Sequence, residues 1–340
     1  MRFSIVAAVY NEELYLKAFL DAVLNQTYKD YEVIIVDDGS TDASGKICDE
    51  YKQRYAEIDM KVIHQENAGV LRAKRNGLQE ATGDYVVLLD SDDLPEYTLL
   101  ESVAEALSDN NADVVVYRVN HLDADGNKHL NENHSEVFGK DKILYTGSEK
   151  KVLCGQLIDN TLWHAMWCKA VRRNIICADR GYEDATNVCN GEDLLQTMAC
   201  FDAAESILCL NKALYNYRPV MTGLSKKDNP KSFVSFAYVY KVLEEHLVKW
   251  DMQSELPRLY RFFLSIAYDD LVRVIGSGKS FNEIKQRMQY IRQDSFYLHA
   301  VERLQGQAIL PTRKVMIILL KLKCYGLLKG FLMYKELRKK

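Results

Sequence analysis

Short runs of valine, isoleucine and leucine recur along the first ninety residues of the chain. Continuous apolar runs of this kind are typical of strands buried on both faces of a parallel sheet. The runs are Phe3–Val9, Glu32–Val36, Lys61–His64 and Tyr85–Asp90. Stretches with helical periodicity, such as Glu12–Leu24, separate them. This alternation predicts right-handed crossovers and a Rossmann-like α/β fold, with a mostly parallel sheet and helices on both faces.

The pattern changes further along the chain. The next predicted elements are helix Glu96–Leu107, strand Asp113–Val119, helices Ser148–Ile158 and Gly191–Phe201, and strands Ser206–Leu210 and Ala213–Tyr217. Helical periodicity dominates from Ser232 onward. The predicted helices there are Phe233–Val248, Pro257–Ile275, Phe281–Ile291 and Thr312–Leu337. We therefore predict an α/β domain over residues 1–229 and a helical C-terminal region over residues 230–340.

Composition excludes several classes of protein. The 340 residues are 48% hydrophobic and carry a formal net charge of −4, so the whole molecule does not attract nucleic acid. The eight cysteines form no CxxC pair that would suggest a zinc or redox site. No apolar leader opens the chain, and no stretch reaches the roughly 18 uninterrupted apolar residues of a membrane-spanning helix. We expect a cytoplasmic protein.

Residues 314–340 form a basic and apolar tail. It holds eight Lys or Arg residues against one acid, Glu336. On a helical wheel most of the lysines share one arc beside a broad apolar face, with Lys323 as the exception. The lysines on this arc are Lys314, Lys321, Lys329, Lys335 and Lys339. The pattern predicts a helix lying on an anionic membrane, peripheral on the inner face of the cell membrane; the alternative is a core or dimer helix with solvated lysines.

Polar residues gather where the predicted strands end. The three ends are Ala8–Glu12, Asp37–Asp42 and Asp90–Asp93. The absence of a GxGxxG loop and of a GKT or GKS loop argues against nicotinamide and P-loop chemistry. The three carboxylates of Asp90–Asp93 would repel one another unless a cation lay among them, and oxygen ligands suit Mg²⁺ or Mn²⁺. The alternative is that these residues cap a helix that begins at Pro95.

An ordered series of motifs joins these strand ends to later parts of the chain. The early motifs are Val9-Tyr10-Asn11-Glu12, Val36–Asp42, Asn67-Ala68-Gly69, Ala81–Tyr85 and Leu89–Asp93. In order and spacing they resemble family 2 glycosyltransferases of the GT-A fold. The later motifs are Met166–Lys169, Gly191–Leu195 and Leu214–Arg218, and they are similar to those of bacterial members that build surface polysaccharide. The resemblance implies a donor half over residues 1–120 and an acceptor half over residues 121–229.

The resemblance also implies roles for single residues. Tyr10 would lie against the nucleobase and Asp38 would bind the base or ribose edge. The DXD segment Asp90-Ser91-Asp92 would hold ribose, metal and diphosphate, with Asp92 as the ligand of Mn²⁺ or Mg²⁺. The residues assigned to the donor site are Ala8, Tyr10, Glu12, Asp38, Lys74, Asp90, Ser91 and Asp92. Lys74 is assigned as the positive charge at the diphosphate by alignment alone, because many family members have Ala-Arg-Asn where this chain reads Ala73-Lys74-Arg75. Arg72 and Arg75 are the alternatives, since the three basic side chains cannot all face one side of a helix.

The acceptor side is assigned in the same way. Asp193 would be the general base that takes a proton from the acceptor hydroxyl, a task that needs an ionised carboxylate within hydrogen-bond reach. Glu192 and Trp167 would lie on the acceptor side. Each assignment has a structural alternative: Tyr10 and Trp167 could be packing residues, Asp38 could only stabilise a turn, and Glu192-Asp193 could only complement a helix dipole.

These observations predict an inverting hexosyl- or hexosaminyltransferase. It would move a sugar from a nucleotide-sugar donor, which we expect to be a UDP-sugar, to a hydroxyl of a glycan or lipid-linked acceptor in surface polysaccharide synthesis. One alternative is a nucleotidyltransferase, which would normally carry a glycine-rich basic loop after the first strand. The other is a non-catalytic scaffold that keeps the fold.

Overall fold

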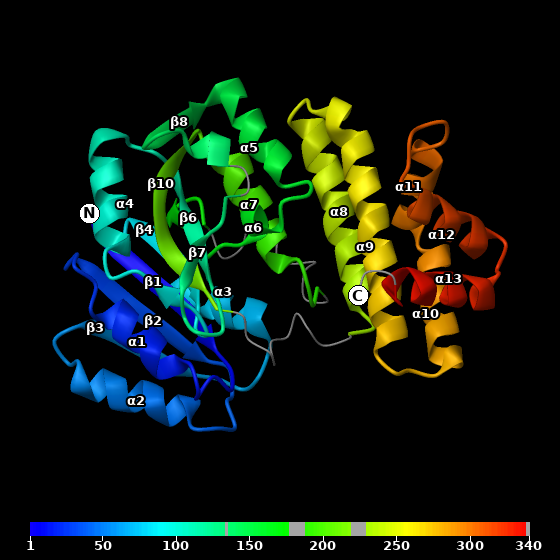
Figure 1. Ribbon diagram of the computed structural model, residues 1–340. Coiled ribbons are helices and arrows are strands. Elements are labelled where there is room, and N and C mark those ends of the chain that lie inside the picture. Colours follow the sequence, from blue (N-terminus) through cyan, green and yellow to red (C-terminus); the bar gives the residue numbers. More distant parts are fainter. Residues whose placement is uncertain (133–134, 177–187, 219–228, 338–340) are drawn as a thin grey trace. The chain divides into compact units, whose positions relative to one another are not determined.

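The computed structural model describes residues 1–132, 135–176, 188–218 and 229–337, which form two compact units (Figure 1). Of the described residues, the first unit holds 1–132, 135–154, 161–176 and 193–218, and we call it the sheet unit. The second holds 155–160, 188–192 and 229–337, and we call it the helical unit. The domain boundary predicted near Asn229 remains a proposal.

A ten-stranded sheet forms the centre of the sheet unit, in the order β3-β2-β1-β4-β9-β6-β10-β5, with β7 paired to β6 and β8 paired to β10. The strands are β1 (Phe3–Val9), β2 (Tyr31–Asp37), β3 (Asp59–His64), β4 (Tyr85–Asp90), β5 (Leu94–Pro95), β6 (Val114–Leu122), β7 (Lys128–Leu130), β8 (Lys142–Thr146), β9 (Lys169–Arg172) and β10 (Ser206–Tyr217). The four strands from β3 to β4 pair in parallel, as do β6 and β10. The predicted α/β fold with a mostly parallel central sheet is confirmed.

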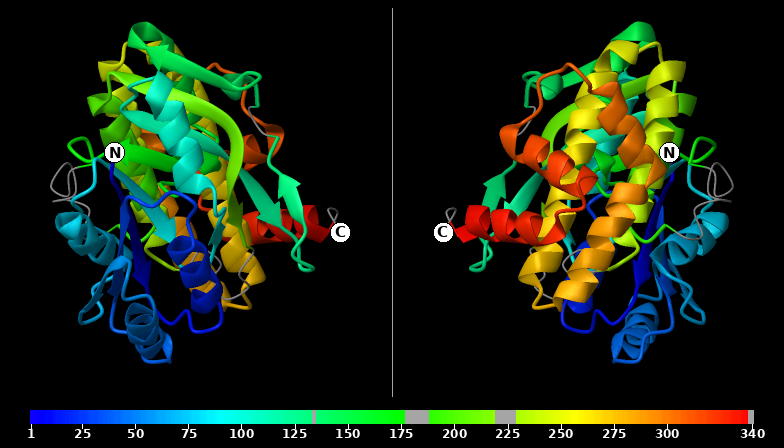
Figure 2. Two further views of the ribbon diagram at one scale, coloured as in Figure 1. Left: turned by 90° about the vertical axis from the view of Figure 1, so that its left-hand side faces the viewer. Right: turned by 90° about the vertical axis from the view of Figure 1, so that its right-hand side faces the viewer.

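Helices pack on both faces of this sheet. The helices up to residue 203 are α1 (Leu16–Leu24), α2 (Ser44–Arg54), α3 (Val70–Glu80), α4 (Leu99–Asp109), α5 (Lys151–Gln156), α6 (Thr161–His164) and α7 (Glu192–Ala203). Helices α1 and α2 lie on one face of β1 to β3, and α3 lies on the other (Figures 1 and 2). The apolar residues Leu16, Phe19 and Leu20 of α1 are buried.

Several features of the sheet differ from the sequence prediction, and the short strands β5, β7 and β8 were not predicted. Strands Ser206–Leu210 and Ala213–Tyr217 are one strand, β10, whose register against β6 shifts between Leu210 and Ala213. Strand β9 was not predicted; its four residues pair antiparallel with both β4 and β6. A four-residue strand carries too little periodicity to be recognised from sequence.

The helical unit is built around one long helix. Its helices are α8 (Ser232–Lys249), α9 (Leu256–Gly276), α10 (Phe281–Gln293), α11 (Ser295–Arg303), α12 (Pro311–Lys321) and α13 (Tyr325–Leu337). Helix α9 contacts each of the other five. The guanidinium of Arg287 on α10 donates to both carboxylate oxygens of Asp270 on α9, at 2.7 and 2.9 Å, in the interior of this unit.

The single helix predicted over Thr312–Leu337 is wrong, because the chain turns between α12 and α13. Lys323 adopts a φ of 58°, and its N–H bonds the carbonyl of Leu320 while the N–H of Cys324 bonds that of Leu319. These two bonds define a Schellman helix end. In one continuous helix, the buried residues of α13 would lie roughly 130° around the axis from those of α12, so the turn lets both apolar faces pack inward. Lys339, part of the predicted arc, lies outside the described residues.

Within the described ranges, no helix combines the length and the apolar character needed to cross a bilayer. Of the seven cysteines described there, five are buried, and none forms a disulfide with another of the seven. Cys177 lies outside the described residues.

Candidate active site

The carboxyl ends of the central strands meet at one edge of the sheet unit. Ala8 of β1 lies opposite Val36 of β2 and Asp90 of β4, so the polar segments that follow these strands start from adjacent positions. Ligands bind at this edge in open α/β sheets. The structure therefore places the predicted donor segments together at an edge suited to binding.

The turns after β1 and β2 are joined by side-chain hydrogen bonds. The N–H of Asn11 donates to Ser40 Oγ at 3.1 Å, and the N–H of Thr41 donates to Asn11 Oδ1 at 2.8 Å. Asn11 has a φ of 57°, in the left-handed region that asparagine tolerates better than most residues. Tyr10 is 44% exposed, so it is not the core residue of the structural alternative. Its role against a nucleobase stays a prediction.

Asp38 bonds to the loop that leads into α3. Its carboxylate accepts hydrogen bonds from the N–H groups of Ala68 and Gly69, at 2.9 and 2.8 Å, and from the side chain of Gln65 at 2.6 Å. The residue is only 2% exposed. Asp38 thus anchors the N-terminus of α3, and its predicted contact with the base or ribose stays a prediction.

The acidic residues at this edge perturb one another. Burial, followed by the charge of Asp90, raises the pKa of Asp92 to about 6. Burial, followed by the charge of Asp92, raises the pKa of Glu12 to about 7. Burial together with Asp92 and Asp90 raises the pKa of Asp93 to about 8. Carboxylate pKa values rise when burial and like charge are not offset by nearby cations, so this edge would be stabilised by added positive charge.

Ser91 and Asp93 point their polar atoms at the protein. The Ser91 hydroxyl donates to the carbonyl of Ala8 at 2.9 Å. Asp93 accepts from the Tyr215 hydroxyl at 2.9 Å and from the N–H of Arg218 at 2.7 Å. Both residues are buried, whereas Asp90 and Asp92 are half-buried. Asp90 and Asp92 are therefore the carboxylates of this segment best placed to meet a ligand.

Lys74 joins the donor edge to the predicted base. Its ammonium Nζ lies 3.0 Å from Asp90 Oδ1 and 3.4 Å from Asp193 Oδ1. Lys74 comes from α3, Asp90 from the end of β4 and Asp193 from the first turn of α7. Three predicted site residues that are far apart in sequence thus meet at one point.

The two residues assigned to the acceptor side differ in placement. Trp167 is buried, and its ring stacks on Tyr215 at 4.8 Å and on Tyr217 at 5.8 Å between centroids. The Tyr215 hydroxyl also donates a hydrogen bond to Asp93, so Trp167 contacts the acidic edge indirectly, through Tyr215. Glu192 is half-buried as the first residue of α7. The acceptor roles of both residues stay predictions.

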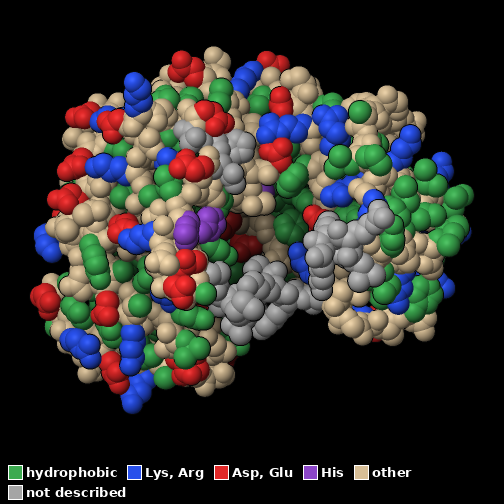
Figure 3. Space-filling view, in the orientation of Figure 1, with side chains coloured by type: hydrophobic (Ala, Val, Ile, Leu, Met, Phe, Trp, Pro, Cys, Tyr) green, Lys and Arg blue, Asp and Glu red, His purple; other side chains and the backbone are tan. Residues whose placement is uncertain are grey.

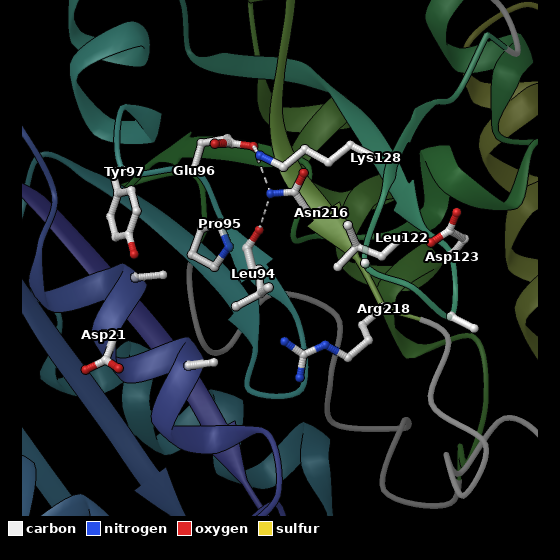
Figure 4. A pocket seen from close by; sticks show the side chains of 14 residues that line it. Asp21, Leu94, Pro95, Glu96, Tyr97, Leu122, Asp123, Lys128, Asn216 and Arg218 are labelled. Atoms are coloured by element: carbon white, nitrogen blue, oxygen red, sulfur yellow. Dashed lines mark hydrogen bonds and ion pairs between the residues drawn. The ribbon is translucent and has the colours of Figure 1, made fainter.

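Arg218 had no predicted role, although it ends one of the recognised motifs. Its guanidinium lies 4.9 Å from the centre of the Tyr15 ring, and its charge lowers the pKa values of Glu12 and Asp92. It also lines a groove of about 610 Å³, toward which its side chain extends between α1 and β5 (Figure 4). The motif Leu214–Arg218 carried the signal, but only the fold brings Arg218 to the acidic edge.

No group of three or more His, Cys, Asp or Glu side chains in the described parts of the chain is arranged to hold a metal ion. A complete protein cage is not required, because Mg²⁺ is usually bound through one or two carboxylates together with substrate phosphates. Asp92 is half-buried beside Asp90 and has a raised pKa. These residues fit a divalent cation that is shared with a diphosphate.

The fold and the site together define a class of protein. An α/β sheet with an acidic carboxyl edge, linked through a lysine to a carboxylate on a later helix, suits a nucleotide-dependent transferase of the GT-A fold. The sequence profile described as glycosyl transferase family 2 matches residues 4–176. The match covers more than half of the chain, so this protein belongs to glycosyl transferase family 2, a family of glycosyltransferases.

Individual relatives agree with this assignment. Glycosyltransferase GlyA of Streptococcus pneumoniae serotype 4 is 31% identical to this protein over 66% of this chain. The match spans only 32% of GlyA's own length. The Bacillus subtilis protein EpsH is 27% identical over 83% of this chain and 80% of its own. A crystal structure of S. aureus TarS residues 1–349 in complex with UDP matches 99% of this chain and 92% of that chain, with a TM-score of 0.68 and 19% identity. The GT-A fold prediction is confirmed.

Proposed function

We propose that this protein transfers a sugar from a nucleotide-sugar donor to an acceptor hydroxyl, with inversion at the anomeric carbon. The observation that carries the proposal is the meeting of Asp90, Lys74 and Asp193. It places a donor-side carboxylate and a candidate base within reach of one ammonium group. A sugar whose diphosphate lay at the acidic edge would then present its anomeric carbon near the base.

The reaction needs one base and one leaving group. Asp193 accepts the proton of the acceptor hydroxyl while the hydroxyl oxygen attacks the anomeric carbon. The bond from that carbon to the diphosphate breaks, and the nucleoside diphosphate leaves with the electron pair. Attack opposite the leaving group inverts the configuration. Asp193 lies in the first turn of α7, a position within the sheet unit that also brings it to Lys74.

We propose Mn²⁺ or Mg²⁺ as the cofactor, with Asp92 as its protein ligand. A bound divalent cation would neutralise the charge that develops on the departing diphosphate. The raised pKa of Asp92 supports this assignment, because added positive charge favours its ionised form. Arg218 contributes further positive charge on the same side.

A UDP-sugar is the donor we propose, since the TarS structure of the same fold was obtained with UDP. The acceptor we propose is a hydroxyl of a surface glycan or of a lipid-linked precursor. TarS itself is named a poly(ribitol-phosphate) beta-N-acetylglucosaminyltransferase, so its name gives a polymeric acceptor. Transfer of a hexose or an N-acetylhexosamine fits both considerations.

We further propose that α12 and α13 bring the protein to an anionic membrane surface, as a peripheral protein on the inner face of the cell membrane. Their outward side combines apolar and basic residues (Figure 3). Ile318, Leu322 and Leu327 are exposed, and so are Lys314, Lys321 and Lys323. An anionic surface complements this charge, whereas a second copy of the same surface would repel it.

The direct test is release of UDP from a panel of UDP-sugars, with Mn²⁺, in the presence and absence of acceptor glycans. The parent protein should consume one donor. Asp193→Asn should slow transfer by about 10²- to 10⁴-fold while UDP binding is kept. Release of pyrophosphate from a nucleoside triphosphate would instead indicate a nucleotidyltransferase. Binding of UDP without consumption of any sugar donor would support the scaffold alternative.

A further inference from the structure

We propose that Lys74 is a positioning residue that holds the general base Asp193 against the donor-side carboxylate Asp90. The inference rests on the proposed function. It replaces the predicted direct contact of Lys74 with the diphosphate, and it makes the placement of the base depend on the donor side of the sheet.

The burial of Lys74 is the first observation. The residue is only 3% exposed, so its ammonium offers little surface to a ligand from solvent. An ammonium is buried at acceptable cost only when carboxylates and hydrogen bonds replace its water. Asp90 and Asp193 supply two such carboxylates, at 3.0 and 3.4 Å. Lys74 is thus engaged by protein carboxylates before any donor arrives.

The second observation is that the helix carrying Lys74 is fixed at two points. Asp38 accepts the N–H groups of Ala68 and Gly69 at the start of α3. Further along, Gly77 brings α3 so close to the sheet that a β-carbon there would lie 2.5 Å from Val6 Cγ1. Lys74 lies between these two anchors. Its ammonium therefore has a defined position relative to the ends of β1, β2 and β4.

The partners of Lys74 are fixed to different degrees. Asp90 ends β4, whose pairing with β1 extends to Asp90 itself. Asp193 is the second residue of α7, and the described residues just before this helix, 188–191, have no regular secondary structure. The ion pair therefore connects Asp193 to Lys74, a residue 119 positions away in sequence. Without it, Asp90 and Asp193 would retain like charges at close range and would move apart.

The primary test is the crystal structure of Lys74→Met beside that of the parent protein. Removing the ammonium should displace the Asp193 carboxylate from Asp90, whereas Lys74→Arg should keep it in place. Lys46→Met is the matched control. It also removes a lysine charge from a helix, but the side chain of Lys46 is 80% exposed. An Asp193 carboxylate that stays in its parent position in Lys74→Met would overturn the proposal. If Lys74→Met does not fold, displacement of Asp193 in Lys74→Arg would overturn it too.

Binding and turnover separate this role from a contact with the diphosphate. Calorimetric titration with UDP and Mn²⁺ should give Lys74→Met a dissociation constant within about threefold of the parent value. Its rate of donor consumption should fall by up to about a hundredfold, the scale expected for a misplaced catalytic group. Lys74→Arg should recover most of that rate. A tenfold or greater loss of UDP affinity would overturn the proposal in favour of a phosphate ligand.

A double-mutant cycle tests whether Lys74 acts through Asp193. Adding Lys74→Met to Asp193→Asn should produce no further loss of rate, because residues that act through one another are not additive. Multiplied losses would overturn the proposal. If the parent consumed no sugar donor at all, the proposed function would fail, and the position of Asp193 in the Lys74 variants would still decide this inference.

Discussion

Buried charges serve different ends in the two units of this protein. In the sheet unit, the buried ammonium of Lys74 lies between carboxylates that are themselves partly open to solvent. In the helical unit, Asp270 and Arg287 pair with each other and both are buried. The first arrangement leaves charge available to a ligand, and the second fixes one helix against another. A buried charge therefore indicates a functional site only where it is paired with groups that a ligand can reach.

The largest effect that this comparison predicts is on stability. Asp270→Ala leaves the Arg287 guanidinium buried without that partner, which should lower the free energy of unfolding by about 3–5 kcal/mol. The affinity for UDP should not change. Chemical denaturation and UDP calorimetry on the same preparation provide both values.

Replacing both members of that pair is the control. Asp270→Leu combined with Arg287→Met should recover most of the lost stability, because apolar pairs can substitute for buried ion pairs. A loss of UDP affinity in Asp270→Ala would contradict the division of roles between the units.

The next effect concerns Asp38, whose loss should affect stability and binding together. Asp38→Asn cannot accept as many hydrogen bonds from Gln65, Ala68 and Gly69, so we expect unfolding to become easier by about 2 kcal/mol. The start of α3 should loosen and UDP affinity should fall several-fold. The exposed Asp109→Asn is the matched control. Unchanged stability would show that Asp38 does not anchor α3.

A smaller effect is expected at the outward side of α12 and α13. Leu322 is 63% exposed, so Leu322→Asp should leave the fold intact while weakening sedimentation with phosphatidylglycerol vesicles by about three- to tenfold. Val248→Asp, at another exposed apolar site of the helical unit, is the control. Equal binding to vesicles with and without phosphatidylglycerol would refute a charge-assisted membrane surface.

The smallest effect is a pH dependence that arises from Glu12, which is only half-buried, so that solvent screens much of its interaction energy. Its pKa is raised from 4.5 to about 7 in the folded protein, mainly by burial, so between these pH values the folded state binds more protons than the unfolded state. The free energy of unfolding of the parent protein, measured relative to that of Glu12→Gln, should therefore fall as the pH rises from 4.5 and level off above 7. Melting temperatures of the two proteins across this range, without metal, would measure the trend. A difference that grew with pH would contradict it.

Sequence reasoning succeeded where local pattern and chemistry coincide. The strands that carry the donor edge are continuous apolar runs, and their polar ends follow directly in the chain, so both β1 and β4 were predicted with their observed bounds. The pairing of β9 between β4 and β6 depends on residues far apart in sequence and was missed. The turn at Lys323 was also missed, because a lysine in the left-handed region carries no glycine signal.

The site was predictable to a similar extent. Motifs identified its residues one by one, but no local pattern could show that Lys74 lies between Asp90 and Asp193. Nor could it show that the side chains of Asp38 and Ser91 form hydrogen bonds within the protein. These features arise from tertiary packing, which only the assembled sheet unit displays.

The measurement that tests the central claim most directly is calorimetric titration of UDP, with and without Mn²⁺, into the parent protein and Asp92→Asn. If the acidic edge of the sheet unit is a metal-assisted nucleotide-sugar site, the parent should bind UDP more tightly with Mn²⁺, and Asp92→Asn should lose this gain. The absence of UDP binding to the parent under both conditions would contradict the claim.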